Sequence, residues 1–321
     1  MNEFNRHYRT IPLLLMPIFS ATSMASDINM NISGKIGIHS LLQSGKDLQT
    51  STYLSSITGN GNYSSDWGNV ITTFTGDYSD YANDENKVNI REASMVIKTK
   101  KFGSFYSGKG QSGQYNTMYK YIDVHNFNSF HPDTSSQLFR QSQYGNNVFA
   151  YISPWLETAY GKFQTRVSVP TPFNESGNTF DVLSARLLYN HNNFIFRVNR
   201  VETSKEALSQ ENNYVRWASV VGHQWQHLHA AFLFESGKHD PKGYEDVFGL
   251  ALTGLYENWK LAISLQSESR SDQIKNRKIS IASATYYFDE HFSLFLEGAN
   301  YSEAINNNSD SNLSLGIVMN F

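Results

Sequence analysis

The 321-residue sequence contains no cysteine, few prolines and no run of 18 apolar residues. Without cysteine there can be no disulfide and no lipid anchor attached to a cysteine. Without a long apolar run, no helix of the chain is expected to cross a membrane. The formal net charge is -3 and basic runs are absent, which argues against a nucleic-acid partner. Phosphate-loop and dinucleotide-binding patterns are also missing.

Aromatic residues are abundant in a chain that is polar on average. They make up 14% of the sequence, with 19 tyrosines and 21 phenylalanines, while the mean hydropathy is -0.45. Asparagine, serine and glycine are plentiful as well. This composition favours strands with one apolar and one polar face over amphipathic helices.

The first 25 residues form a segment of their own. Arg6 and Arg9 precede a short apolar run, IPLLLMPIF (11–19), and small residues follow up to Ala25. This order is typical of a secretory signal peptide, and the apolar run is too short to span a bilayer. Pro12 and Pro17 weaken the alternative of a buried N-terminal helix. We therefore expect residues 1–25 to be a signal peptide and residues 26–321 to be the exported protein.

Apolar and polar side chains alternate in many segments of the exported chain. In segment 28–38, isoleucines and a methionine alternate with polar residues. The final stretch, LSLGIVMNF (313–321), repeats the pattern, with Val318 as the one apolar residue on its polar face. Segments of period two predict strands with one apolar face.

The connections between these segments alternate between short and long. Long connections such as 112–145 and 203–213 are rich in polar residues and glycine, whereas 154–156 and 257–258 are short. Sandwich loops follow no such rule, but outer-membrane barrels have short turns at one end and long loops at the other. A barrel also closes for a physical reason, because an open sheet edge in hydrocarbon leaves backbone groups unpaired.

We therefore predict one all-β domain, a transmembrane antiparallel β-barrel. Sixteen strands are expected, at 28–42, 50–58, 66–76, 87–99, 103–111, 146–153, 157–169, 181–190, 194–202, 214–222, 227–235, 247–256, 259–270, 278–288, 292–302 and 312–321. If the segment 43–87, which is dominated by Ser, Thr, Asn, Gly and Tyr, is a loop, the barrel has fourteen strands.

The segment VNIREASMVIKTKKFGSFYSGKG (88–110) resembles the fourth and fifth strands of Gram-negative general diffusion porins. In that family a strand with an arginine is followed by a tight turn, a Gly-x-Phe/Leu-x-Tyr/Leu strand, and a glycine with a basic residue, here Gly108 and Lys109. NNVFAYISPWL (146–156) resembles the next strand, and ATYYFDEHFSLFLEGANY (284–301) resembles the penultimate hairpin. Phe321 matches the family's C-terminal aromatic residue. The resemblance covers the layout of essentially the whole exported chain.

The resemblance implies a water-filled channel, narrowed by the loop after the fifth strand. That loop is about 112–145 here, and its aromatic residues favour packing against a wall. The acidic loop tip of enterobacterial members is absent, so Asp123 and Asp133 are the carboxylates that can replace it, beside Lys120 and Arg140. The ion preference therefore does not carry over from the family.

Charged residues on the polar strand faces are expected to point into the lumen, because a charge that faces lipid costs about 2–4 kcal/mol at the bilayer midplane. Alternation places five residues there: Lys35, Arg186, Arg197, Lys260 and Glu268. Lys109 joins them by the resemblance alone, because alternation is ambiguous around Gly108. Opposite the loop carboxylates, a basic wall would create a transverse field that selects ions. Ordinary lumen charges solvated by water are the alternative.

Other chemistry has little support in the sequence. His223, His227 and His229 form the pattern H-x-x-x-H-x-H, but no further ligand completes a metal shell, so we expect no metal and no cofactor. The chain has no Gly-x-Ser-x-Gly elbow, no His-x-Ser-Asn-Gly type motif and no paired-carboxylate cluster, so we expect that it is not an enzyme.

We therefore expect an outer-membrane porin that passes small hydrophilic solutes and ions passively. The resemblance implies a homotrimer in the outer membrane of a Gram-negative bacterium, in contact with lipid and lipopolysaccharide. It also implies that the outer-membrane assembly machinery recognises Phe321. Two alternatives are a monomeric channel specific for sugars or oligosaccharides, with the loop aromatics as a stacking surface, and a non-conducting adhesin or receptor barrel.

Overall fold

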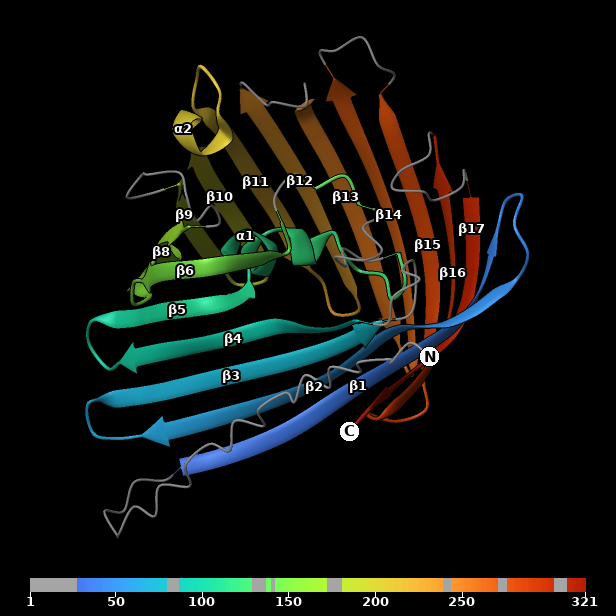
Figure 1. Ribbon diagram of the computed structural model, residues 1–321, viewed down its shortest axis with the longest axis horizontal. Helices are drawn as coiled ribbons and strands as arrows, with labels where there is room; N and C mark the ends of the chain where they lie inside the picture. The colour runs from blue at the N-terminus through green and yellow to red at the C-terminus, as the bar shows by residue number, and fades with distance from the viewer. Residues whose placement is uncertain are drawn as a thin grey trace, which may run out of the picture.

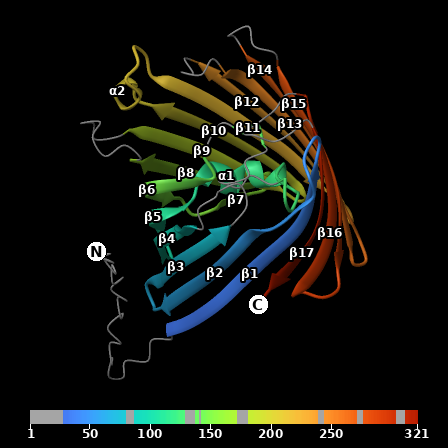
Figure 2. The ribbon, with the colours of Figure 1, turned by 45° about the vertical axis from the view of Figure 1, so that its right-hand side comes forward.

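One antiparallel sheet closes on itself to form a barrel (Figures 1 and 2). The computed structural model describes residues 28–79, 87–128, 137–139, 142–171, 181–238, 244–270, 276–302 and 311–321. Each strand pairs with its neighbours in the chain, and β1 (Ile28–Gln43) also pairs with β17 (Ser311–Asn320) to complete the ring. The predicted signal peptide, 1–25, lies outside the described residues.

The remaining strands follow the chain around the barrel. They are β2 (Gln49–Ser64), β3 (Gly68–Ser79), β4 (Lys87–Thr99), β5 (Gly103–Gln111), β6 (Tyr144–Ile152), β7 (Leu156–Thr158), β8 (Gly161–Pro170), β9 (Val182–His191), β10 (Phe194–Thr203), β11 (Tyr214–Gln224), β12 (Leu228–Lys238), β13 (Tyr244–Tyr256), β14 (Trp259–Arg270), β15 (Arg277–Tyr287) and β16 (Phe292–Tyr301).

β6 and β7 are two parts of one strand of the wall. Both pair with β8, and between them the Ser153 N–H donates to the Thr165 carbonyl at 2.9 Å. The interruption coincides with Pro154, which has no N–H to give to the sheet. The wall therefore has sixteen strands, as predicted. The predicted turn at 154–156 is wrong, because the strand continues past Pro154 and turns at 159–160 instead.

The segment 43–87 belongs to the wall and is not one long loop. β2 pairs with β1 and β3 as far as Ser64, six residues beyond the predicted end of this strand. Gly59, Gly61 and the asparagines around them interrupt the apolar alternation in this part of β2. Backbone pairing does not depend on an apolar face, so the strand persists where the side-chain pattern fades. The fourteen-strand alternative is therefore excluded.

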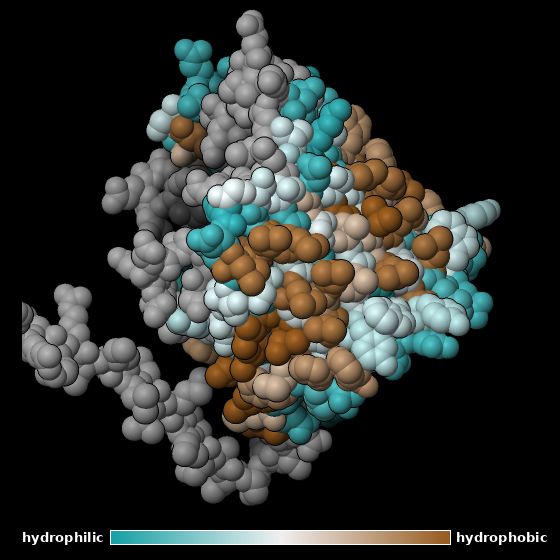
Figure 3. All heavy atoms as spheres, turned by 90° about the vertical axis from the view of Figure 1, so that its right-hand side faces the viewer, coloured by the Kyte–Doolittle hydropathy of each residue, from teal (hydrophilic) through white to brown (hydrophobic). Residues whose placement is uncertain are grey.

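The outer face of the barrel is apolar. Every second residue of the strands is exposed and mostly large and hydrophobic, as in the row Leu313, Leu315, Ile317 and Met319 of β17. Figure 3 shows part of this face, where hydrophobic residues gather in a broad band between hydrophilic ends. An apolar outer band is what a barrel needs to contact hydrocarbon.

Exposed aromatic side chains cluster at the short-turn end of the barrel. They lie in or beside the turns at 65–67, 100–102, 159–160, 225–227, 257–258 and 288–291, and at the chain's last residue. They are Trp67, Phe102, Tyr160, Trp225, Tyr256, Trp259, Phe288 and Phe321. A ring of aromatic residues of this kind marks the interface between hydrocarbon and water in membrane barrels.

The seam between the first and last strands extends to Phe321. The Gly34 N–H donates to the Phe321 carbonyl at 2.7 Å, and the Phe321 N–H donates to the Gly34 carbonyl at 3.0 Å. Val318, the apolar exception of the sequence pattern, faces inward and is buried against Leu41 and Phe295. The inner face of the barrel is therefore partly an apolar core. Among the described residues, no helix is long and apolar enough to cross a membrane.

Gly103 offers a test of the turn that joins β4 to β5. Its φ is +84°, and a Cβ atom there would lie 2.2 Å from the Ile152 carbonyl oxygen of the neighbouring strand. Gly103→Ala should therefore destabilise the barrel by about 1–3 kcal/mol, measured as a lower temperature of unfolding on gels. Gly254→Ala is the matched control, because a Cβ atom at Gly254 meets nothing within 4 Å. Equal stability of the two variants would contradict the strained turn.

Candidate functional site

The described parts of the segment between β5 and β6, which are 112–128, 137–139 and 142–143, lie inside the barrel. The segment begins with α1 (Gly113–Thr117) and a 3-10 turn, η1 (Tyr119–Tyr121), which Figure 2 shows within the ring of strands. The Ser112 hydroxyl accepts a hydrogen bond from the Tyr115 N–H at 3.1 Å and so caps α1. We call this segment the inner loop. It coincides with the predicted constriction loop, 112–145.

The inner loop packs first against an apolar part of the wall. Met118, Tyr119 and Ile122 are fully buried. They contact small and branched residues on the inner face of β11, β12 and β13, which are Ala218, Val220, Ala231, Leu233 and Ala251. Full burial of such a loop side chain stabilises by about 1.5–3 kcal/mol, so this contact alone holds the start of the loop to the wall.

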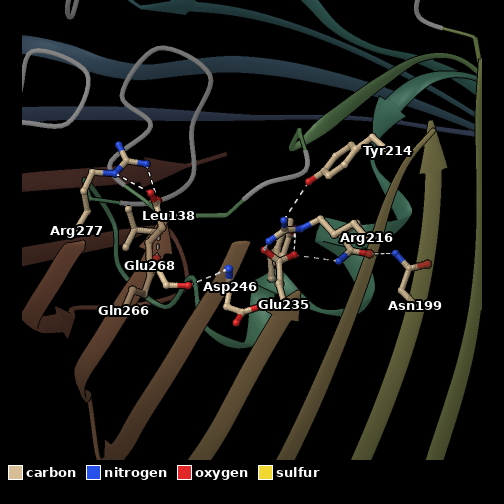
Figure 4. Close-up of polar contacts among 12 residues, drawn as sticks. Leu138, Asn199, Tyr214, Arg216, Glu235, Asp246, Gln266, Glu268 and Arg277 are labelled. Carbon is tan, nitrogen blue, oxygen red and sulfur yellow. Dashed lines mark hydrogen bonds and ion pairs between the residues drawn. The ribbon is translucent and has the colours of Figure 1, made fainter. Parts of the chain in front are cut away.

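A buried ion pair supports the same contact. Glu235 of β12 pairs with Arg216 of β11 at 2.7 Å, and both side chains are at most 1% exposed (Figure 4). The Tyr119 hydroxyl also donates to Glu235. Burial, and secondarily the charge of Glu235, raises the pKa of Tyr119, so the hydroxyl keeps its proton. Gln114 of α1 donates to Glu235 at 3.4 Å and accepts from Asn199 of β10. Removing either ion of such a buried pair costs about 3–5 kcal/mol.

The next part of the loop is bound to β14 and β15 by polar contacts. The Lys260 ammonium donates to the Val124 carbonyl at 2.6 Å. The two ring nitrogens of His125 each lie 2.8 Å from a serine hydroxyl, Ser264 on one side and Ser283 on the other. Burial, and secondarily the charge of Lys260, lowers the pKa of His125 to about 3, so the imidazole is neutral at neutral pH.

The loop then reaches the far wall of the barrel. The fully buried carboxylate of Glu297 on β16 accepts from the N–H groups of Asn126 and Asn128, at 2.9 and 2.5 Å. Phe127 packs among His39, Tyr53 and Leu41 of β1 and β2. The described end of this part therefore touches both sides of the seam that closes the barrel.

A second piece of the inner loop, residues 137–139, contacts the wall at β13, β14 and β15. The Leu138 N–H donates to Gln266 of β14 at 2.8 Å (Figure 4). The Leu138 side chain is buried with Val247, Ile279 and Ile281. Phe139 stacks on Tyr119 with a centroid distance of 4.3 Å. The loop aromatics thus pack against the wall, as the sequence suggested.

The predicted pore-lining residues are only partly arranged as expected. Lys120 is exposed on the loop and lies over the ring of Tyr121, and the Asp123 carboxylate accepts from the Tyr115 hydroxyl at 2.6 Å. Lys260 lies under the loop as an anchor and does not face it across the lumen. Glu268 is buried, and it pairs with Arg277 of β15 at 2.6 Å (Figure 4). Its charge is therefore neutralised within the wall.

Two further expectations concern β1 and β5. Lys35 is on the inner face of β1 and is close enough to Lys260 and Arg91 for their like charges to repel it. Lys109 is opposite Ala93, an exposed residue of the outer face, so the register places Lys109 on the outer side and not in the lumen. The resemblance misled here because the register shifts between Gly108 and Gly110. Asp133 and Arg140 lie outside the described residues.

Arg186 and Arg197 are on the inner face of β9 and β10, and their pore-lining role stays a prediction. Arg166 of β8 joins them, and sequence reasoning missed it. The signal was present, because Gln164, Arg166 and Ser168 alternate with Thr165, Val167 and Val169. Arg216 and Glu235 were missed for a different reason, since only the strand register brings them together.

The three histidines of the H-x-x-x-H-x-H pattern do not converge. His223 pairs with Ala230 and faces outward beside Trp225, whereas His229 faces inward beside Tyr121. Within the described ranges, no group of three or more His, Cys, Asp or Glu side chains could hold a metal ion.

Comparison with known proteins gives structural neighbours but no sequence relatives. No protein-family model and no curated protein matches the chain. OmpF of Salmonella typhi, in a complex with daunomycin, superposes with a TM-score of 0.69 at 12% identity, over 91% of this chain and 97% of that one. The anion-selective porin from Comamonas acidovorans gives 0.68 at 11%, over 92% and 100%. The chain has the porin fold. The trimer form of OmpT from Vibrio cholerae, an outer membrane protein, also gives 0.68 at 11%, over 92% and 99%.

His125 predicts a pH dependence of loop docking. Its pKa is near 3 when docked and about 6.5 when exposed, so the docked loop binds fewer protons between these values. Docking is therefore fully favourable above about pH 6.5 and weakens by about 1.4 kcal/mol for each further unit toward pH 3. We expect fluctuations of the single-channel current to increase from pH 7 to pH 4, and His125→Gln to remove most of this increase. His291→Gln, in an exposed turn, should behave like the unchanged protein, and identical pH profiles of all three would contradict the prediction.

Proposed function

We propose that the chain is an outer-membrane porin, through which small hydrophilic solutes and ions diffuse passively. The observation that carries the proposal is the inner loop, which is fixed inside a closed sixteen-stranded barrel with an apolar outer face. A barrel of sixteen strands is wide enough for an aqueous channel, and a loop bound to its wall narrows the opening without filling it. No reaction step is involved, and we propose no catalytic role and no cofactor.

Location and assembly are part of the same proposal. The apolar band and the aromatic ring at the short turns fit a barrel that spans a bilayer, with its long loops outside the cell. We propose the outer membrane of a Gram-negative bacterium, after cleavage of residues 1–25, with lipid and lipopolysaccharide around the barrel. Trimer formation and recognition of Phe321 by the assembly machinery rest on the resemblance to porins. Small outward residues such as Ala93 and Ala185 are compatible with a subunit contact.

The sugar-specific alternative has less support. A stacking surface for sugars needs aromatic faces that are open to the lumen. Tyr119 is fully buried against Phe139, and Phe127 is 3% exposed among wall residues. Tyr121, the next aromatic residue of the loop, is half-buried and contacts His229 and Lys120. These aromatic groups hold the loop in place and are not free to bind a ligand.

Conductance in planar bilayers tests the proposal. The refolded protein should insert in steps of three equal conductance units, as expected for a trimer of open channels. Steps of one unit that a particular sugar blocks would support the sugar-specific channel, and absence of conductance would support the adhesin or receptor barrel.

Deletion of residues 115–135 tests the role of the inner loop. Removing them takes away the anchors at Met118, Tyr119, Ile122 and Phe127, so the lumen should widen and the unit conductance should rise about twofold. Deletion of residues 205–212, which include α2 (Lys205–Leu208) at the barrel rim, is the matched control and should leave the conductance unchanged. Folding of both variants is checked by their shift on unheated gels. A folded 115–135 deletion with unchanged conductance would refute the constriction.

A further inference from the structure

The first strand extends past the point where the barrel closes. β17 pairs with residues 35–43 of β1, and Phe321 adds a last pair with Gly34. Beyond Gly34, residues 28–33 pair with β2 on one side, and none of the described residues pairs with them on the other. Figure 1 shows this end of β1 projecting beyond the C-terminus along the border of the sheet. We call residues 28–33 the open edge.

The open edge presents backbone donors and acceptors. Both the N–H and the C=O of Gly34 bond to Phe321. Alternation along β1 therefore directs the same groups of Ile28, Met30 and Ile32 to the same side. These three residues also form the apolar outer row of the open edge, and they are 56%, 82% and 74% exposed. The row is covered only from Gly34 onward, where the Phe321 ring takes the place that a Cβ atom would need.

An uncovered open edge is unfavourable on either side of the membrane boundary. In hydrocarbon, its unpaired N–H and C=O groups have no water to take the place of a partner. In water these groups are solvated, but the row of Ile28, Met30 and Ile32 is then exposed to water, beside a ready template for strand pairing. A strand added along the edge removes both costs, because it pairs the backbone groups and covers the apolar row.

A second copy in the same membrane cannot supply this strand by symmetric pairing. Two identical strands that pair through the same edge need a two-fold axis either perpendicular or parallel to both strands. Copies in one membrane are related by axes along the membrane normal, and the strands of such barrels are tilted by about 35–45° from it. Their open edges would therefore cross instead of running side by side. If residues 1–25 are cleaved as proposed, only two residues precede Ile28, too few to cover the edge.

The composition of the open edge defines the partner that fits it. Its sequence, INMNIS, carries no charge, and neither do the residues 58–63 that pair with it on β2. β17, which occupies the adjoining part of the same edge, likewise has one apolar row and no charge. We propose that the open edge binds an extended, uncharged segment of a periplasmic protein, with apolar side chains at every second position. The inference rests on the proposed orientation, which places the short turns in the periplasm, and not on conductance.

The test measures binding of a synthetic peptide to the refolded exported protein in detergent. The probe is a fluorescent peptide with the sequence of residues 312–321, because this strand already pairs with β1. Its fluorescence anisotropy should rise in a saturable way as protein is added. The same peptide with Ser314→Pro and Ile317→Pro has lost an N–H on each of its edges and should not bind.

Ile32→Pro removes one N–H of the open edge and keeps the pairing with β2, because the Ile32 N–H points away from β2. The variant should fold, as judged by its shift on unheated gels, and its conductance should be unchanged. The peptide should bind it about tenfold more weakly. Ile57→Thr is the matched control, because Ile57 is exposed on the outer face of β2, opposite Gly34, and is not at the edge. Its affinity for the peptide should equal that of the unchanged protein.

Absence of saturable binding, or equal binding to the unchanged protein and to Ile32→Pro, would overturn the docking site. An equal loss in Ile57→Thr would overturn it as well, because the apolar outer face in general would then hold the peptide. So would a changed number of subunits in Ile32→Pro, or binding that appears only after residues 1–25 are removed, because the chain itself would then occupy the edge. Absence of conductance would instead refute the proposed function and leave peptide binding unaffected.

Discussion

The structure depends on the pairing of every backbone N–H and C=O group that faces hydrocarbon. No water is present there to replace a missing partner, so the sheet must close, and the pairing of β1 with β17 closes it. Closure fixes the alternation of side chains around the whole ring, with one row toward lipid and the next toward the interior. The seam is reinforced on its inner side, where Leu41, Val318 and Phe295 pack around the loop residue Phe127.

The interior is best described as two regions of different character. From β11 through the seam to β2, the wall and the inner loop bury apolar side chains, and Arg216 and Arg277 each pair with a buried carboxylate. On β8 to β10 the wall carries three arginines without carboxylate partners among the described residues. The loop lies between these regions, because its apolar residues pack toward the first and the Tyr121 hydroxyl reaches Arg197 of the second. The asymmetry of charge in the lumen thus follows from the side to which the loop is bound.

Alternation in the sequence was sufficient to predict the sixteen strands and the direction in which most side chains point. Alternation wrongly predicted a turn at Pro154, because the irregular part of this strand between β6 and β7 has the composition of a turn. It also could not predict the apolar inner positions such as Val220 and Leu233, because the rule assumes that inward residues face water, and here they face the packed side chains of the loop. The partners of Glu268 and Glu235 required the strand register, which hydrophobic pattern does not give. Arg166 was within reach of the same rule that placed Arg186.

The path of the inner loop has a mechanical consequence. A ring of strands joined only to their neighbours resists stretching within the sheet, but little prevents it from flattening into an ellipse. The loop leaves the wall at β5 and is fastened to β12, β14 and β16, with Phe127 inserted beside β1 and β2. It therefore acts as an internal brace that fixes the distance between opposite walls. Changes in lateral pressure of the surrounding bilayer should leave the cross-section of the barrel nearly constant.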